Sequence, residues 1–96
     1  MLYSEILYQT LNSCLNNFNP DLVIFDTGVD IHENDKLGNL KITTEGLLKR
    51  DITVLEFFKN KSIPIATVIG GGYSNDKLEL AKRHSLIFKA TSMVFN

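Results

Sequence analysis

Side chains that could do chemistry gather in two glycine-bearing segments of the sequence. The first, residues 26–38, closes an acidic stretch, because five of the six acidic residues before position 36 lie between Asp21 and Asp35. A metal-binding loop and a solvated acidic loop both fit that pattern, and charge alone favours the solvated loop. The second segment, Gly70–Ser74, places Tyr73 directly after three glycines.

The glycine run at 70–72 has an alternative use, because glycine-rich turns at a helix N-terminus cradle phosphate. The residues that follow it, Tyr73-Ser74-Asn75, match neither the G-x-G-x-x-G fingerprint nor a P-loop that ends in Gly-Lys-Ser/Thr. A phosphate site is therefore disfavoured. Taken by itself, Tyr73 would be an ordinary half-buried aromatic residue. Its place directly after three glycines at a strand end favours a functional role.

Two short apolar runs predict the strands that would position these segments. Leu22–Phe25 and Ile63–Ile69 are rich in β-branched residues, and each has a proline near its start. Such runs are typical of parallel strands buried on both faces. Glycine follows each run, and ligands bind beyond the carboxyl ends of parallel strands. Parallel pairing would bring the acidic loop beside the glycines.

Apolar residues with helical spacing flank the two strands. Residues 3–17 repeat them at intervals of three and four, with Cys14 expected as a packed core thiol. A second helix should take Thr44 as its N-cap and end near Lys61, between the strands. A last helix should start near Asn75. Strand, helix and strand in this order predict a βαβ unit with parallel strands.

The expected fold is a single α/β domain over residues 1–96, a three-layer α-β-α unit with a short parallel sheet and flanking helices. A length of 96 residues fits one domain and weighs against a complete metabolic enzyme. A two-stranded sheet has two unpaired edges, which invite further strands. The sequence therefore predicts part of a larger sheet.

Composition excludes several classes of protein. No run reaches the roughly 18 apolar residues of a membrane span, and the N-terminus lacks the features of a signal peptide. A single cysteine excludes an internal disulfide framework and favours a reducing, cytoplasmic setting. Residues 1–35 carry no Lys or Arg, whereas residues 36–96 carry ten. Those ten form no tight cluster with aromatics between them, so direct nucleic-acid binding is not expected.

Four motifs occur in order along the chain: Pro20-Asp21-Leu22-Val23-Ile24, Gly28-x-Asp30, Asp35-x-Leu37-Gly38 and Gly70-Gly71-Gly72-Tyr73-Ser74. Together they resemble the C-terminal part of the histone deacetylase and acetoin utilization protein family. Three further stretches fit the bacterial branch of that family: Thr44-Glu45-Gly46-Leu47, Arg50-Asp51 and Arg83-His84-Ser85. The resemblance covers nearly the whole chain. It implies that the chain is a fragment of the arginase-deacetylase fold.

The resemblance implies hydrolysis of acetyl-lysine or a similar acetylated amide, with Zn²⁺ as the cofactor and ferrous iron as an alternative. It implies that Asp30 is one metal ligand and that Tyr73 stabilises the oxyanion of the substrate carbonyl. Gly71 and Gly72 would present the tyrosine ring to the cleft, and Leu37 would line the substrate channel. Acetylated proteins, polyamines and small-molecule amides are all compatible substrates.

The sequence departs from the family in what it lacks. The upstream Asp-x-His ligands and the histidine pair that acts as general base have no counterpart here, so we expect a truncated chain that is inactive alone. Asp30-Ile31-His32 repeats the Asp-x-His pattern, but at the position of the third ligand. His32 is therefore expected to be a loop histidine, with metal binding the less favoured alternative. Asp26 has no assigned role, and His84 is expected to be structural or at the surface.

A different class of function also fits the sequence. The chain could be a non-catalytic remnant or an interaction module that docks through its exposed sheet edges. Its partner would be a second copy of itself or a separately encoded N-terminal half that completes the sheet.

Overall fold

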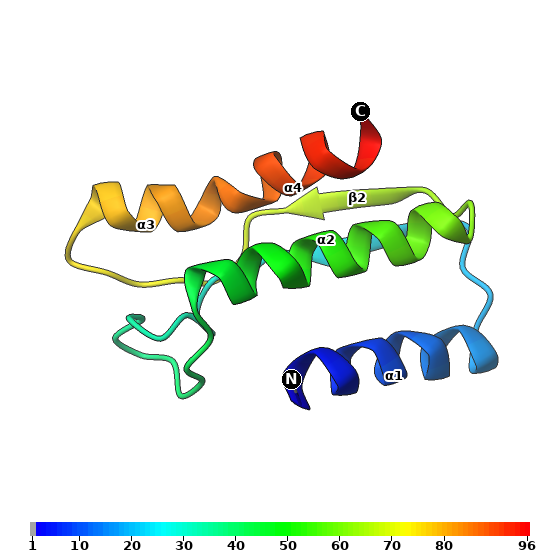
Figure 1. Cartoon of the computed structure of the whole chain (residues 1–96), viewed down its shortest axis with the longest axis horizontal. Coiled ribbons are helices and arrows are strands. Elements are labelled where there is room, and N and C mark those ends of the chain that lie inside the picture. The colour runs from blue at the N-terminus through cyan, green and yellow to red at the C-terminus, as the bar shows by residue number, and fades with distance from the viewer. Residues whose placement is uncertain (1) are drawn as a thin grey trace.

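The computed structural model describes residues 2–96 as a parallel two-stranded sheet with helices packed against it (Figure 1). In chain order the elements are α1 (Leu2–Asn17), β1 (Val23–Asp26), α2 (Thr44–Asn60), β2 (Ile65–Val68), α3 (Lys77–His84) and α4 (Leu86–Phe95). β1 pairs with β2 from Val23 opposite Ile65 to Asp26 opposite Val68. The predicted α/β class and the strand–helix–strand order are therefore confirmed.

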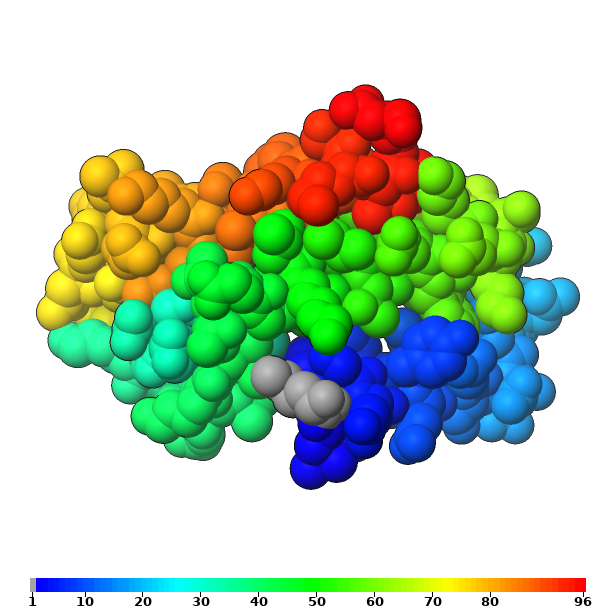
Figure 2. Space-filling model, viewed as in Figure 1, coloured from blue at the N-terminus to red at the C-terminus, as the bar shows by residue number. Residues whose placement is uncertain are grey.

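The helices pack against one face of this sheet, the face to which Phe25 and Ile65 point. Both residues contact two clusters of buried apolar side chains. The first cluster joins α2 to α4 and contains Leu55, Ile87, Ala90 and Val94. The second contains Val54, Phe57 and Phe58 of α2, with Leu7, Leu11 and Leu15 of α1 packed against it. Figure 2 accordingly shows α2 in green between α1 in blue and α4 in red.

The opposite face of the sheet is exposed, which corrects the expectation that both strands are buried on both faces. Ile24 on β1 is 68% exposed and Val68 on β2 is 46% exposed. The reason is that the crossover helix α2 and the flanking helices α1 and α4 all lie on the side of Phe25 and Ile65. Residues 2–96 thus supply two of the three expected layers, the sheet and one layer of helices.

The helix starts differ from expectation by one or two residues. The N-cap of α2 is Thr43 rather than Thr44, because the Thr43 hydroxyl accepts a hydrogen bond from the Gly46 N–H at 3.0 Å. The helix expected near Asn75 begins at Lys77, because the Asp76 carboxylate caps it. Two adjacent cap-type residues make such an offset common.

The last helix is divided in two at Ser85. The Ser85 hydroxyl donates a hydrogen bond to the Lys82 carbonyl at 2.6 Å, and this local side-chain bond competes with the helical ladder. The apolar pattern continues across the break, so the sequence predicted one helix.

The expectation that Cys14 is a packed core thiol is wrong, because Cys14 is exposed on α1 while Leu11 and Leu15 face the core. No helix within residues 2–96 is both long and apolar enough to cross a bilayer.

Candidate functional site

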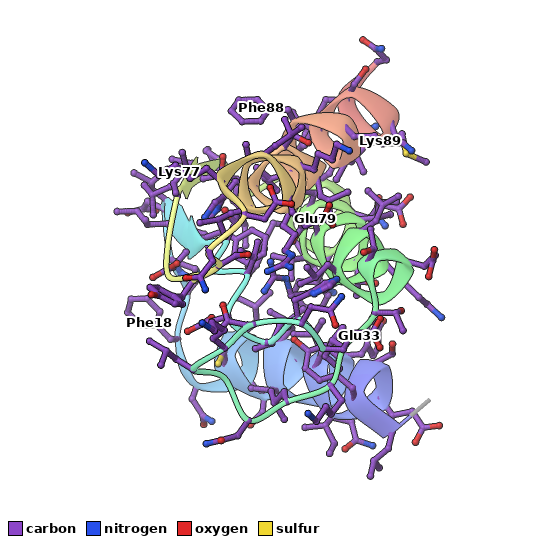
Figure 3. The ribbon with its side chains drawn as sticks, turned by 90° about the vertical axis from the view of Figure 1, so that its left-hand side faces the viewer. Phe18, Glu33, Lys77, Glu79, Phe88 and Lys89 are labelled. Carbon is purple, nitrogen blue, oxygen red and sulfur yellow. The ribbon has the colours of Figure 1, made fainter. Side chains whose placement is uncertain are left out.

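The candidate site lies where β1 and β2 end side by side. Beyond the last strand pair, the Thr27 N–H donates to the Val68 carbonyl at 3.0 Å, and the Val29 N–H donates to the Gly71 carbonyl at 2.7 Å. The two glycine-bearing segments are therefore in backbone contact, as parallel pairing predicts. The end-on view of Figure 3 faces the loop after β1, where Glu33 is labelled, and the loop that leads to Lys77 at the start of α3.

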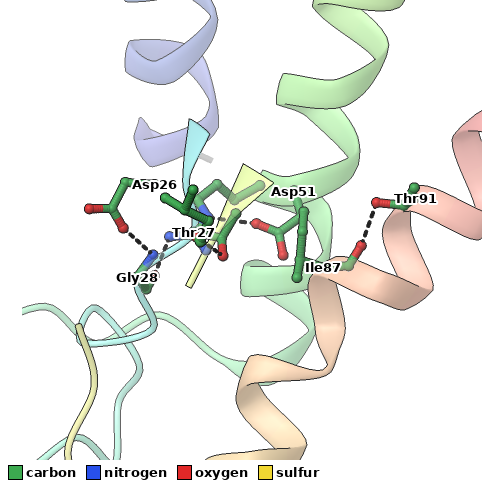
Figure 4. A network of polar contacts seen from close by, with 8 residues as sticks. Asp26, Thr27, Gly28, Asp51, Ile87 and Thr91 are labelled. Atoms are coloured by element: carbon green, nitrogen blue, oxygen red, sulfur yellow. Dashed lines mark hydrogen bonds and ion pairs between the residues drawn. The ribbon is translucent and has the colours of Figure 1, made fainter. Parts of the chain in front are cut away.

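Two carboxylates lie directly against the glycine run. A Cβ on Gly70 would collide with the carboxylate of Asp26, and one on Gly71 would lie 2.9 Å from Oδ2 of Asp30. Any larger residue at these positions would displace the carboxylates, so the glycines permit the close approach. Asp26 turns back to accept a hydrogen bond from the Gly28 N–H at 3.1 Å (Figure 4). Asp30 is exposed and faces solvent at this edge.

Tyr73 follows, at the same edge, a glycine in a conformation that suits glycine alone. Gly72 has a φ of 156°, which L-residues rarely adopt, and a Cβ there would lie 2.6 Å from Cγ2 of Val29. The Tyr73 side chain is 45% exposed, and its hydroxyl lies 3.5 Å from Oδ1 of Asn75. The phenol therefore lies at the surface, where a ligand can reach it. The Lys36 ammonium lies 5.9 Å from the centre of its ring.

Leu37 lies on the loop after β1, two residues after Asp35. It is 75% exposed, although apolar, and its backbone is fixed through its N–H. The structure therefore places the sequence-predicted residues Asp30, Leu37, Gly71, Gly72 and Tyr73 on two touching loops. Their assigned roles stay predictions.

Asp35 is the residue that the sequence reasoning did not single out. Its carboxylate is 7% exposed and accepts three backbone hydrogen bonds: from Leu37 at 2.9 Å, Gly38 at 2.8 Å and Tyr73 at 2.7 Å. Burial by itself would raise the pKa of this carboxyl, but the three N–H donors and the charge of Arg83 outweigh burial and lower the pKa below its ordinary value. The sequence signal that could have identified Asp35 is its place in the Asp35-x-Leu37-Gly38 motif.

His32 is buried as an anchor of the first loop. Its Nδ1 accepts a hydrogen bond from the Asn34 N–H at 3.1 Å, which leaves the proton on Nε2 to be donated to the Thr44 hydroxyl at 2.9 Å. Burial and the charge of Arg83 lower the pKa of His32, which favours this neutral form. Because both ring nitrogens are engaged within the chain, the geometry supports the loop-histidine expectation over metal binding.

A buried ion pair on α2 contacts the backbone of the loop that carries Asp30. Arg50 on α2 donates from Nε to Oδ1 of Asp51 at 2.9 Å and from Nη1 to the Gly28 carbonyl at 2.7 Å. Burial raises the pKa of the Asp51 carboxyl, and the Arg50 charge opposes this only in part. Arg50 thus links the crossover helix to the backbone two residues before Asp30.

The carboxylates of residues 2–96 do not by themselves form a complete metal centre. Catalytic zinc takes three protein ligands and keeps a further position for water or substrate. Residues 2–96 bring together no group of three His, Cys, Asp or Glu side chains that could hold a metal ion. A complete zinc site is therefore not formed by the described residues alone.

Comparison with known proteins places the two loops in a family context. A family model described as "Histone deacetylase domain" matches residues 1–87. An uncharacterized protein of Picosynechococcus sp. is 42% identical over 93 residues, which are 97% of this chain and 31% of the relative. Histone deacetylase 2 of Arabidopsis thaliana is 37% identical over 92 residues, 88% of this chain and 24% of the relative.

Histone deacetylase 1 of Homo sapiens is 29% identical over 72 residues, which are 75% of this chain and 14% of the relative. The chain thus spans less than a third of the length of each of these three curated relatives.

Proposed function

Because this chain belongs to the histone deacetylase family, we propose that it takes part in deacetylation. In this proposal its two touching loops form one wall of an amide-hydrolysing site. The observation that carries the proposal is the contact between the Asp30 loop and the glycine run that leads to Tyr73. It brings a carboxylate and a phenol to the same edge of a parallel sheet, where ligands bind in open α/β folds.

The proposed task of Tyr73 is to stabilise negative charge on the substrate. Attack on an acetyl amide turns its carbonyl oxygen into an oxyanion, and a fixed donor aimed at that oxygen lowers the barrier. The Tyr73 phenol is half exposed and carries an O–H that can serve as this donor. Gly71 and Gly72 let the backbone place the ring at the edge.

The proposed task of Leu37 is to contact the apolar stem of an acyl-lysine. Its side chain is among the most exposed of the large apolar side chains, and it follows the Asp35 anchor on the loop that carries Asp30. Acetylated proteins and small acetylated amides both present such a stem beside the reactive carbonyl. We propose these two classes as substrates of the complete site.

Asp30 is proposed as one ligand of the family's zinc in that complete site. Alone it would hold the metal weakly, because several deprotonated ligands have to act together. The further ligands and the base that activates water would come from outside the described residues. We therefore propose that the chain does not turn over substrate by itself.

Turnover of an acetyl-lysine peptide by the isolated chain with added zinc tests that proposal. We expect a rate equal to that of zinc in buffer. Turnover that is lost in Tyr73→Phe and kept in Tyr8→Phe would contradict the proposed inactivity, because it would show a complete site in this chain. Tyr8 is a suitable control because it lies on α1 and packs edge-on against Phe57.

The exposed sheet face favours a second candidate function, an interaction module completed by another polypeptide. Leu22, Ile24 and Val68 are 57%, 68% and 46% exposed. An apolar groove of about 300 Å³ lies between α1 and the start of β1, lined by Leu11, Cys14, Leu15, Phe18, Pro20, Leu22, Val23 and Phe58. Phe18 projects outward from the ribbon in Figure 3 and is 69% exposed. Large exposed apolar surfaces mark interaction sites.

We propose a complementing N-terminal half as the occupant of this surface. Its strands would extend the sheet and cover the exposed face. Size-exclusion chromatography with light scattering, for the chain alone and co-expressed with such a half, tests the proposal. We expect a heterodimer that binds zinc. A monodisperse monomer under both conditions would contradict it, and a homodimer of the chain alone would favour self-association instead.

A further inference from the structure

The Asp35 carboxylate stands at the junction of the two loops that form the candidate site. Oδ1 accepts from the N–H groups of Leu37 and Gly38, within its own loop. Oδ2 accepts from the N–H of Tyr73, which is 38 residues away in sequence. The side chain forms no ion pair with any residue of the described chain, so its hydrogen-bonding capacity is used on backbone amides.

The bond to Tyr73 is one of two links that flank Gly72. On one side the Gly71 carbonyl accepts from the Val29 N–H at 2.7 Å. On the other side the Tyr73 N–H donates to Asp35 at 2.7 Å. Gly72 lies between them at a φ of 156°. The turn at Gly72 is thus bonded on both sides to the first loop.

The first loop is closely packed where Asp35 holds it. A Cβ on Gly38 would collide with the Asp30 carbonyl oxygen, so the Gly38 backbone lies directly against Asp30. The chain Asp30–Gly38–Asp35–Tyr73 is therefore a continuous path of close contacts. It joins the proposed metal ligand to the proposed oxyanion donor through one buried carboxylate.

Only a carboxylate of this length satisfies all three donors. Asn has one acceptor oxygen, and its NH₂ group would face an N–H group on one side or the other, whichever way the amide is turned. Asp35→Asn therefore keeps either the Tyr73 bond or the pair to Leu37 and Gly38. Ala keeps neither.

We propose that Asp35 is a positioning residue, which fixes the Tyr73 ring relative to Asp30 by holding the Tyr73 backbone against the loop that carries Leu37. The importance of this geometry for catalysis rests on the proposed deacetylase function. The geometry itself is measurable in the isolated chain without any activity.

The test is an NMR comparison of the ¹⁵N-labelled chain with Asp35→Asn and Asp35→Ala. In wild type we expect a protected Tyr73 amide and nuclear Overhauser contacts between the Tyr73 ring and the Lys36 side chain, which lies over it. In Asp35→Ala we expect Tyr73 amide exchange to rise about tenfold to hundredfold, as for a lost hydrogen bond to a charged group. The ring contacts to Lys36 should disappear with it.

Asp76→Asn is the matched control, because Asp76 also accepts a backbone hydrogen bond and lies on the same loop, three residues after Tyr73. It should leave Tyr73 unchanged. Unchanged Tyr73 exchange in Asp35→Ala would overturn the proposal, and so would faster exchange with intact ring contacts, because Asp35 would then hold the backbone without positioning the ring.

If the Asp35 variants do not fold, the wild-type chain supplies the test. Acid titration should shift the amide protons of Leu37, Gly38 and Tyr73 with one common midpoint, because one carboxylate accepts all three. Three different midpoints would overturn the proposal. Turnover by a complete site containing these loops that is unaffected by Tyr73→Phe, together with intact NMR results, would reject the proposed function and leave the positioning role of Asp35 standing.

Discussion

The carboxylate of Asp35 accepts the backbone N–H of Tyr73 at 2.7 Å and so joins the loop after β1 to the loop after β2. The same carboxylate holds the backbone of Leu37 and Gly38. The candidate site is therefore organised by backbone hydrogen bonds to a buried anion. This arrangement leaves the side chains of Asp30, Leu37 and Tyr73 exposed for a ligand.

The stability of Asp35→Asn should depend on pH. The folded-state pKa of Asp35 is lowered, so the ionised carboxylate stabilises the fold above its ordinary pKa, and this contribution is lost as pH falls through the folded-state value. We expect the variant to be less stable than wild type by about 1–3 kcal/mol at neutral pH. The difference should shrink once the pH falls below about 4.

Urea denaturation followed by circular dichroism, at neutral and at acidic pH, measures this difference. Asp21→Asn is the control, because Asp21 is exposed and should show little effect at either pH. An equal loss of stability at both pH values would contradict the assignment of the effect to the ionised carboxylate.

Gly72→Ala should destabilise the fold and the Tyr73 loop. The backbone φ of 156° is unfavourable for alanine, and the added Cβ would approach Cγ2 of Val29 to 2.6 Å and Nε2 of His84 to 3.2 Å. A cost of about 1–3 kcal/mol in the free energy of unfolding is expected. Thermal unfolding measures it, and a variant as stable as wild type would show that the turn is not held as described.

Arg50→Met should be among the most destabilising substitutions in the chain. It removes the partner of the buried Asp51 carboxylate and leaves the Gly28 carbonyl without its donor. Breaking a buried pair from one side costs about 3–5 kcal/mol, whereas replacing both partners by apolar residues costs far less. The double variant Arg50→Met with Asp51→Leu should therefore recover stability in denaturation experiments. A double variant as unstable as the single one would contradict this explanation.

Ser62→Gly should stabilise the chain. Ser62 follows α2 with a φ of 57°, the left-handed conformation that costs an ordinary residue about 1–2 kcal/mol and that glycine adopts freely. We expect the free energy of unfolding to rise by about 0.5–1 kcal/mol, because the greater flexibility of glycine in the unfolded chain offsets part of the relieved strain. Lys61→Gly is the matched control, because Lys61 has a φ of −90° and should lose stability instead. Equal effects of the two substitutions on the melting temperature would contradict the prediction.

The sequence predicted the strands well because their signal is local. Val23–Asp26 and Ile65–Val68 follow prolines, are apolar and β-branched, and precede glycine, so type, order and parallel pairing could all be inferred. Their exposure could not be inferred. Whether an apolar strand face is covered depends on which side the helices pack, and the local pattern of Ile24 or Val68 contains no information on that side.

The position of the candidate residues at the strand ends could be predicted, but the contacts that hold them there could not. Tyr73 and Asp30 were found through motif order, but the role of Asp35 depends on a donor 38 residues away, and that contact exists only after β1 and β2 pair. The break at Ser85 was missed for a similar reason. Apolar residues continue across it, and a single hydroxyl bond to Lys82 marks the boundary.

The most direct test of the account is the kcat/KM of a chimera for an acetyl-lysine peptide. In it, residues 2–96 replace the matching segment of histone deacetylase 2 of Arabidopsis thaliana, which is 37% identical over 92 residues. We expect zinc-dependent turnover that falls about a hundredfold or more in Tyr73→Phe, as for the loss of an oxyanion donor, and that persists in Tyr8→Phe. A chimera equally active with Tyr73→Phe would contradict the account, because the loop after β2 would then not supply the donor.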